Sequence, residues 1–191
     1  AWNAKQLATN PDWVYHLTAN DLEELNKCLA ICRDIPTEKI TKNTFPLQQL
    51  KTSIETRFTD QLENGIGTLL IKGIASDKYS KLDLAKLLWG IGLYFGTAVS
   101  QSVAGELLHQ VKDDGYDLQD PRARGTNTKA KLPFHNDPCD VAVLMGVSSA
   151  QSGGDSQIVS SVAIHNAMLE NYPNLLAQLY APYYSEPLKV F

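Results

Sequence analysis

The spacing of hydrophobic and polar residues divides the chain into a helical first part and a strand-rich second part. A polar start at Thr18, with an acid three residues later, opens an amphipathic run and predicts a helix that ends near Pro36. Helical spacing also covers residues 46–62, with a proline in the first turn, and residues 80–95. Residues 65–74 are apolar and contain glycines at both ends, which favours a buried strand.

The pattern changes at about residue 103, where short apolar runs broken by turn residues begin. The predicted strands are residues 106–112, 131–134, 140–147 and 155–160. This spacing is typical of a β-sandwich or barrel, and two short helices at 161–171 and 173–180 follow it. Helices first and strands later predict one α+β domain over residues 1–191 with a β-rich core. The polar residues 112–132 form a long loop, and loops of that length are often functional.

Composition restricts the class of protein and its partners. The chain has 43% hydrophobic and 20% charged residues, as in ordinary globular proteins, and a net charge of −4. That charge offers no attraction to nucleic acid or anionic membranes, and no apolar run reaches the roughly 18 residues of a membrane span. Cys28 and Cys32 lie one helical turn apart among three cysteines, so we expect buried thiols in a reducing, cytoplasmic setting rather than a disulfide framework.

The candidate chemistry lies at His135 and Asp137. Residues i and i+2 of an extended segment point to the same side, so this spacing places an imidazole beside a carboxylate. Non-haem Fe(II) oxygenases bind iron with two histidines and one carboxylate on one face of the metal. Chance supplies roughly 0.4 such His-x-acid spacings in a chain of this composition, so the spacing alone does not assign a metal site.

The surrounding sequence resembles the TauD/TfdA family, named for taurine and 2,4-dichlorophenoxyacetate dioxygenases. The run GTNTKAKLPFHNDPCD at residues 125–140 resembles the iron-binding region of that family. Residues 141–146 and 152–156 are similar to its next strand and glycine turn. Residues 160–166 and 172–175 resemble its following helices, and residues 10–14 and 17–18 its opening segment. The nearest likeness is to the clavaminate-synthase-like branch and its fungal relatives.

The resemblance implies a double-stranded β-helix, a cupin-like jelly-roll, preceded by N-terminal helices. It implies Fe(II) and 2-oxoglutarate as cofactors, with His135 and Asp137 as catalytic iron ligands. Ser156 matches a family Thr or Ser whose hydroxyl donates to the distal carboxylate of 2-oxoglutarate, and Gly153 and Gly154 would form the turn that presents it. The implied reaction uses O2 to hydroxylate or desaturate a small organic molecule and releases succinate and CO2.

Two residues of the family's site are absent from this chain. The family has a second histidine ligand and a later arginine that pairs with 2-oxoglutarate, but the other histidines here are His16, His109 and His165, and no arginine follows Arg124. We expect the chain to be the N-terminal and central part of a longer domain, because half a jelly-roll leaves strand edges uncovered. A second chain that supplies the rest, including a homo-oligomer, and a degenerate relative are the alternatives.

Two other classes of function stay open. One is a non-catalytic or degenerate jelly-roll binding protein, which the absent histidine and arginine favour. The other is an unrelated α+β binding domain in which the His-Asn-Asp match is accidental. The sequence does not identify the substrate, although Arg122 and Arg124 in the long loop are candidates to form ion pairs with an acidic substrate.

Overall fold

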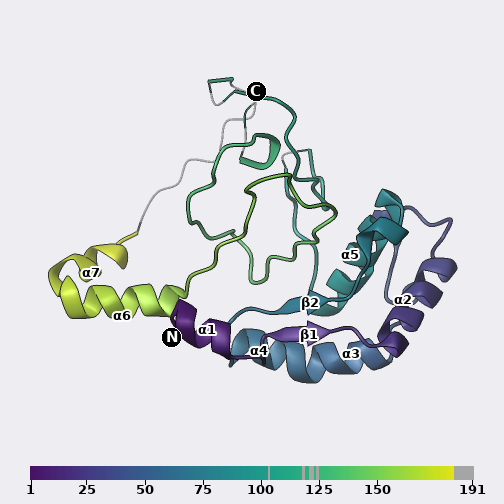
Figure 1. Cartoon of the computed structure of the whole chain (residues 1–191), viewed down its shortest axis with the longest axis horizontal. Coiled ribbons are helices and arrows are strands. Elements are labelled where there is room, and N and C mark those ends of the chain that lie inside the picture. The colour runs from purple at the N-terminus through teal and green to yellow at the C-terminus, as the bar shows by residue number, and fades with distance from the viewer. Residues whose placement is uncertain (103, 118, 121–122, 124, 183–191) are drawn as a thin grey trace.

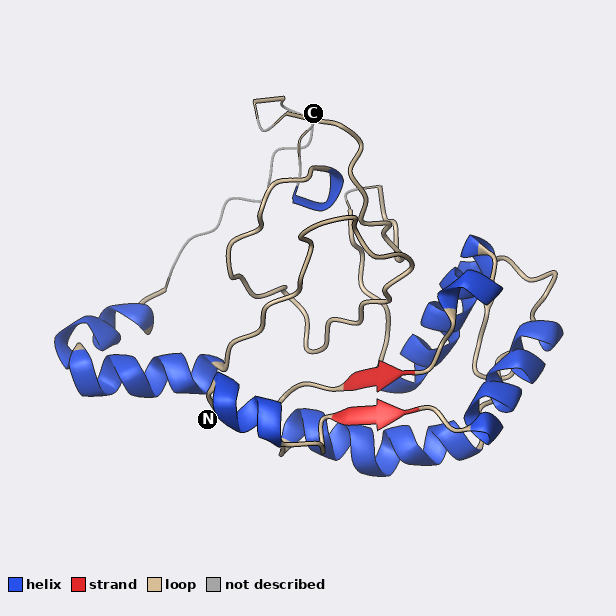
Figure 2. Cartoon of the chain, in the orientation of Figure 1, coloured by secondary structure: helices blue, strands red, loops and turns tan. Residues whose placement is uncertain are grey.

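The computed structural model describes residues 1–102, 104–117, 119–120, 123 and 125–182. Helices and a small sheet from the first 95 residues form one side of the molecule, and long loops extend from it (Figure 1). The described residues between helix α5 (Lys81–Phe95) and helix α6 (Ser161–Asn171) are almost entirely loop, with one short turn of helix (Figure 2). The candidate iron ligands lie in this loop-rich part.

The helices of the first part begin at the polar caps that the sequence predicts. Helix α2 (Ala19–Ile31) starts with a reciprocal capping box between Thr18 and Asp21, and it ends before Cys32, earlier than predicted. Helix α5 (Lys81–Phe95) starts with a second capping box at Ser80. Both predicted helices are therefore confirmed, with one end corrected.

The helix predicted at residues 46–62 is confirmed as three consecutive segments. These are α3 (Gln49–Ser53), a π-helical turn η2 (Ile54–Phe58) and α4 (Thr59–Glu63). The hydroxyl of Thr59 donates to the carbonyl of Ile54 at 2.8 Å across the widened turn. Pro46, which was predicted to lie in the first turn of this helix, lies before the helix instead.

Two short strands form a parallel pair beside these helices. Strand β1 (Val14–His16) pairs with β2 (Leu70–Lys72), with Val14 opposite Leu70. The strand predicted at residues 65–74 thus exists, but it is three residues long and is not buried as predicted. The remaining short elements of the described chain are α1 (Ala4–Thr9), η1 (Thr37–Lys39), η3 (Ser76–Lys78) and η4 (Gly125–Asn127).

A compact apolar core lies between α2, the α3–α4 helix and α5. Its most deeply buried side chains are Leu25, Cys28, Cys32, Phe45, Leu50, Ile54, Phe58 and Leu87. The expectation that the first two cysteines are buried thiols is confirmed, since both are free and buried. Leu107 and Met145, from the loop-rich part, pack against this core and attach that part to it.

The β-rich core predicted after residue 103 is the main correction to the sequence analysis. None of the described residues between 96 and 160 forms a strand, so the double-stranded β-helix is not seen there. Val141, Val143 and Leu144 of one predicted strand are exposed. Alternating apolar residues predict which face of a strand is buried, but a strand also needs a hydrogen-bonded neighbour, and that pairing is non-local.

The two helices predicted near the end of the chain are confirmed. Helix α6 (Ser161–Asn171) is capped by Ser160, and α7 (Pro173–Leu179) starts with a proline in its first turn. Within the described residues, no helix combines the length and apolar character needed to cross a membrane.

Candidate metal centre

His135 and Asp137 lie close together on an irregular segment between η4 and α6. The Nε2 atom of His135 is 3.7 Å from Oδ1 of Asp137, so the two side chains face one another. Their side chains are 51% and 57% exposed, so water and a metal ion can reach both. The His-x-Asp spacing therefore brings an imidazole beside a carboxylate, although the segment is not part of a sheet.

A backbone contact fixes which nitrogen of His135 is available as a ligand. Nδ1 of His135 lies 2.9 Å from the carbonyl oxygen of Pro133. Because a carbonyl oxygen only accepts hydrogen bonds, Nδ1 carries the hydrogen in this contact. When the ring is neutral, Nε2, the atom 3.7 Å from Asp137, has the free lone pair that a metal ligand needs, and backbone carbonyls commonly orient metal-binding histidines in this way.

The pair fits two positions of an iron site but is not a complete one. Ligand bonds of about 2.0–2.2 Å at a right angle would place two donor atoms about 3.0 Å apart. The observed distance of 3.7 Å between Nε2 and Oδ1 is longer than this, and rotation of the two half-exposed side chains can shorten it. In the part of the chain that the structure describes, no group of three or more His, Cys, Asp or Glu side chains could hold a metal ion.

Ser156, the predicted contact to 2-oxoglutarate, follows a pair of glycines with positive φ. Gly153 and Gly154 have φ values of 70° and 77°, a left-handed conformation that glycine adopts without strain. Ser156 lies two residues beyond Gly154 and is exposed. The glycine pair therefore has a conformation that suits glycine, while the turn that presents the serine and the role of the serine stay predictions.

Other residues considered from the sequence have structural contacts or lie elsewhere. The backbone N–H of Cys139 donates to the carbonyl of Asp137 at 2.9 Å, which closes the turn after the candidate ligands. His165, on α6, contacts the hydroxyl of Tyr180 at 2.6 Å, consistent with a structural histidine. Arg122 and Arg124 lie outside the described residues.

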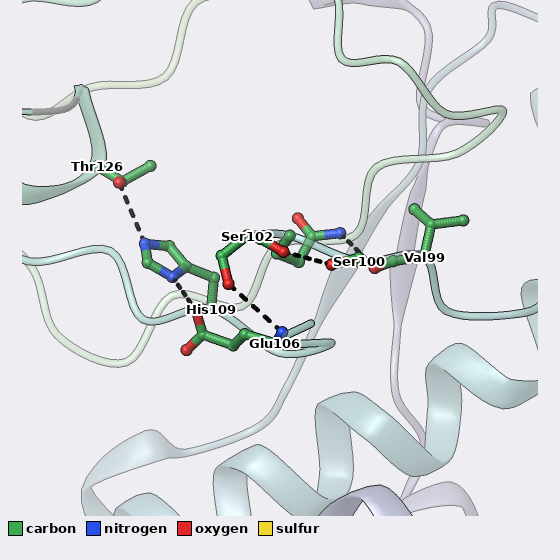
Figure 3. Close-up of polar contacts among 7 residues, drawn as sticks. Val99, Ser100, Ser102, Glu106, His109 and Thr126 are labelled. Carbon is green, nitrogen blue, oxygen red and sulfur yellow. Dashed lines mark hydrogen bonds and ion pairs between the residues drawn. The ribbon is translucent and has the colours of Figure 1, made fainter. Parts of the chain in front are cut away.

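A second polar cluster was not foreseen from the sequence. His109 contacts Glu106 through Nδ1 at 2.8 Å and Thr126 through Nε2 at 3.1 Å (Figure 3). Glu106 and His109 are three residues apart, which is a local signal, but Thr126 is 17 residues further along the chain. Nearby, Lys112 forms an ion pair with Asp114 at 2.8 Å, and the hydrogen bond to this carboxylate raises the pKa of the lysine.

Comparison with known proteins identifies the family to which this chain belongs. The chain belongs to the taurine catabolism dioxygenase TauD, TfdA family, whose sequence model matches residues 33–190. Enzymes of this family are non-haem iron dioxygenases that use Fe(II) with 2-oxoglutarate as co-substrate, and the family implies a cupin-like jelly-roll. The resemblance inferred from the sequence is thereby confirmed.

Two curated proteins are similar to the chain. It is 26% identical over 183 residues to FR-33289 synthase of Streptomyces rubellomurinus, an alignment that covers 94% of this chain and 54% of that protein. It is 24% identical over 188 residues to taurine hydroxylase-like protein SAT17 of Stachybotrys chartarum, covering 94% and 49%. The chain therefore spans about half the length of these relatives. No solved structure has significant similarity to it.

Proposed function

We propose that this chain carries two iron ligands of a 2-oxoglutarate-dependent oxygenase that hydroxylates or desaturates a small organic molecule. The observation that carries the proposal is the facing pair of His135 and Asp137, 3.7 Å apart and open to solvent, in a chain of the TauD, TfdA family. The second histidine ligand and the arginine that pairs with 2-oxoglutarate are not assigned to residues of this chain.

Each residue of the proposed site has a distinct role. Bound Fe(II) would supply the oxidation of a substrate C–H bond by O2, coupled to conversion of 2-oxoglutarate into succinate and CO2. His135 would bind the metal through Nε2, which the carbonyl of Pro133 orients from the other side of the ring. Asp137 would supply an anionic oxygen that offsets the metal's charge, and the Ser156 hydroxyl would donate to the distal carboxylate of 2-oxoglutarate.

The proposed ligand set and the names of the relatives support the proposed class of reaction. One relative is described as a synthase and the other as taurine hydroxylase-like, which favours oxidation of a small molecule. A carboxylate at position 137 favours hydroxylation or desaturation over halogenation, because halogenation needs that coordination position for chloride.

Titration calorimetry on the full-length protein tests these roles, with Co(II) as a probe metal that O2 does not consume. Asp137→Ala should abolish Co(II) binding, because it removes the anionic ligand, while the exposed neighbour Asp140→Ala should bind normally. Ser156→Ala should leave Co(II) binding intact and weaken 2-oxoglutarate binding about 10- to 150-fold, the loss of one hydrogen bond to a charged group. Ser152→Ala, before the glycine turn, is the matched control.

The alternative function predicts different results. A non-catalytic jelly-roll binding protein would show the same Co(II) affinity in the wild type and in Asp137→Ala. It would also show no binding of 2-oxoglutarate by the metal-loaded protein. Either result would replace the oxygenase proposal with the binding-protein alternative.

A further inference from the structure

A histidine bridge joins two segments of the loop-rich part that are distant in sequence. The Nδ1 atom of His109 is 2.8 Å from Oε2 of Glu106, and its Nε2 atom is 3.1 Å from the hydroxyl oxygen of Thr126 (Figure 3). Both ring nitrogens are thus engaged, one within the 106–109 segment and one on the turn η4. The histidine side chain is 36% exposed, so the bridge lies at the surface and not in the core.

The chemistry of the three groups keeps the bridge in place whether or not the ring is charged. A carboxylate only accepts, so the Nδ1–H of His109 donates to Glu106. In the neutral ring Nε2 accepts from the hydroxyl of Thr126, and in the charged ring Nε2–H donates to the same oxygen. The bridge therefore holds the two segments together and does not act as a pH sensor.

The segment that carries His109 is anchored to the rest of the molecule. Leu107, between the two bridge residues, packs against the core of the first part. The N–H of Gln101 donates to the carbonyl of Glu106 at 2.6 Å, and the N–H of Glu106 donates to the hydroxyl of Ser102 at 3.4 Å. The described residues of the 101–109 segment thus form a support that contacts the core through Leu107.

The other end of the bridge is coupled to the candidate metal ligands. Gly125 of η4 lies directly against Leu132, because a Cβ added to this glycine would be 2.4 Å from a methyl carbon of that leucine. Leu132 precedes Pro133, whose carbonyl orients His135. The turn η4 is also held by a backbone hydrogen bond from Lys112 to Thr126 at 3.0 Å.

From this continuous path we infer that His109 is a positioning residue for the candidate metal centre. It fixes η4 on the anchored 101–109 segment, and η4 supports Leu132 and the backbone that orients His135. The inference rests on the proposed function, because it assigns His109 a role toward the same site. The residue does not touch the metal position, so its effect is on ligand geometry and not on chemistry.

Two measurements on the full-length protein test this role. Co(II) affinity and the Co(II) absorption spectrum report the ligand geometry, and amide hydrogen exchange over residues 125–135 reports the order of the supported segment. His109→Ala and Thr126→Val each remove the bridge from one side, and each should weaken Co(II) binding about three- to tenfold, as expected for one lost hydrogen bond. Exchange over residues 125–135 should accelerate in both variants. His165→Ala, which removes a partly buried histidine with its own hydroxyl contact, is the matched control and should change neither measurement.

A conservative variant separates positioning from general destabilisation. His109→Gln keeps a side-chain amide that can reach Thr126, so it should recover part of the Co(II) affinity that His109→Ala loses. Wild-type Co(II) affinity in His109→Ala would overturn the inference and leave the proposed function standing. Faster exchange with unchanged affinity would do the same, because the bridge would then be purely structural. Absence of Co(II) binding in the wild type would overturn both.

Discussion

Glu24 of helix α2 caps a different helix, and this contact makes a quantitative prediction about stability. Oε1 of Glu24 accepts hydrogen bonds from the backbone N–H groups of Gln48 and Gln49, and Oε2 accepts from Leu50 at 3.0 Å. These N–H groups are at the start of α3 and have no partner within their own helix. Gln48, the residue at the cap position, makes no side-chain cap of its own.

Glu24→Ala removes the two acceptor oxygens of these three hydrogen bonds and one negative charge from a helix N-terminus. Loss of a side-chain cap costs about 0.5–2 kcal/mol and loss of the favourable charge about 0.3–1 kcal/mol. The first two N–H groups belong to exposed residues and can turn to water, but Leu50 is fully buried. We therefore expect the free energy of unfolding to fall by about 2 kcal/mol, which lowers Tm by about 4–8 °C in a chain of this size.

Thermal and urea unfolding monitored by circular dichroism check the value, and Glu23→Ala is the control. Glu23 is the preceding residue of the same helix, and its contact is an exposed ion pair with Lys27 at 2.7 Å. Exposed ion pairs contribute little to stability, so the free energy of unfolding of this control should be close to that of the wild type. Equal losses of stability in the two variants would refute the capping role, because they would show only a general effect of removing an acid from α2.

Two further predictions concern the core. Gly90→Ala should lower the free energy of unfolding by about 1–3 kcal/mol, because the added Cβ would lie 2.5 Å from the ring of Phe45. Gly92→Ala in the same helix meets open space and should raise the free energy of unfolding by up to about 1 kcal/mol. Urea titrations of the two variants measure both changes. Burial raises the pKa of Cys28 to about 11, so a thiol reagent at pH 8 should modify exposed Cys139 quickly and Cys28 only on unfolding. The protonated Cys28 favours the folded state below its ordinary pKa of 9.0, and this contribution is lost as the pH rises through about 11.

The sequence predicted the helices well because their signals are local. The capping boxes at Thr18 and Ser80 lie within a single turn of the helices that they start, and both form as expected. The strands depended on partners far away in the chain, which alternation does not encode. The pairing of Val14 with Leu70 was not foreseen, and the predicted strand at residues 140–147 found no partner among the described residues.

The same distinction applies to the candidate site. His135 and Asp137 face one another because they are two residues apart, so their contact could be predicted. The positive φ values of Gly153 and Gly154 before Ser156 are an equally local property. The bridge from His109 to Thr126 joins residues 17 positions apart through a loop, and no pattern in the sequence relates them. The family resemblance supplied the chemistry of the pair, but it gave no information about what holds the pair in place.

Turnover of 2-oxoglutarate addresses the proposed chemistry directly, and it needs no knowledge of the substrate because such enzymes often oxidise 2-oxoglutarate slowly without one. The full-length protein supplied with Fe(II) and O2 should form succinate and CO2 from 2-oxoglutarate, and omission of either should stop the reaction. Asp137→Ala should form none, because it lacks the anionic iron ligand, while Asp140→Ala should match the wild type. Succinate formation at the same rate in the wild type and in Asp137→Ala would contradict the assignment of His135 and Asp137 as the iron-binding pair.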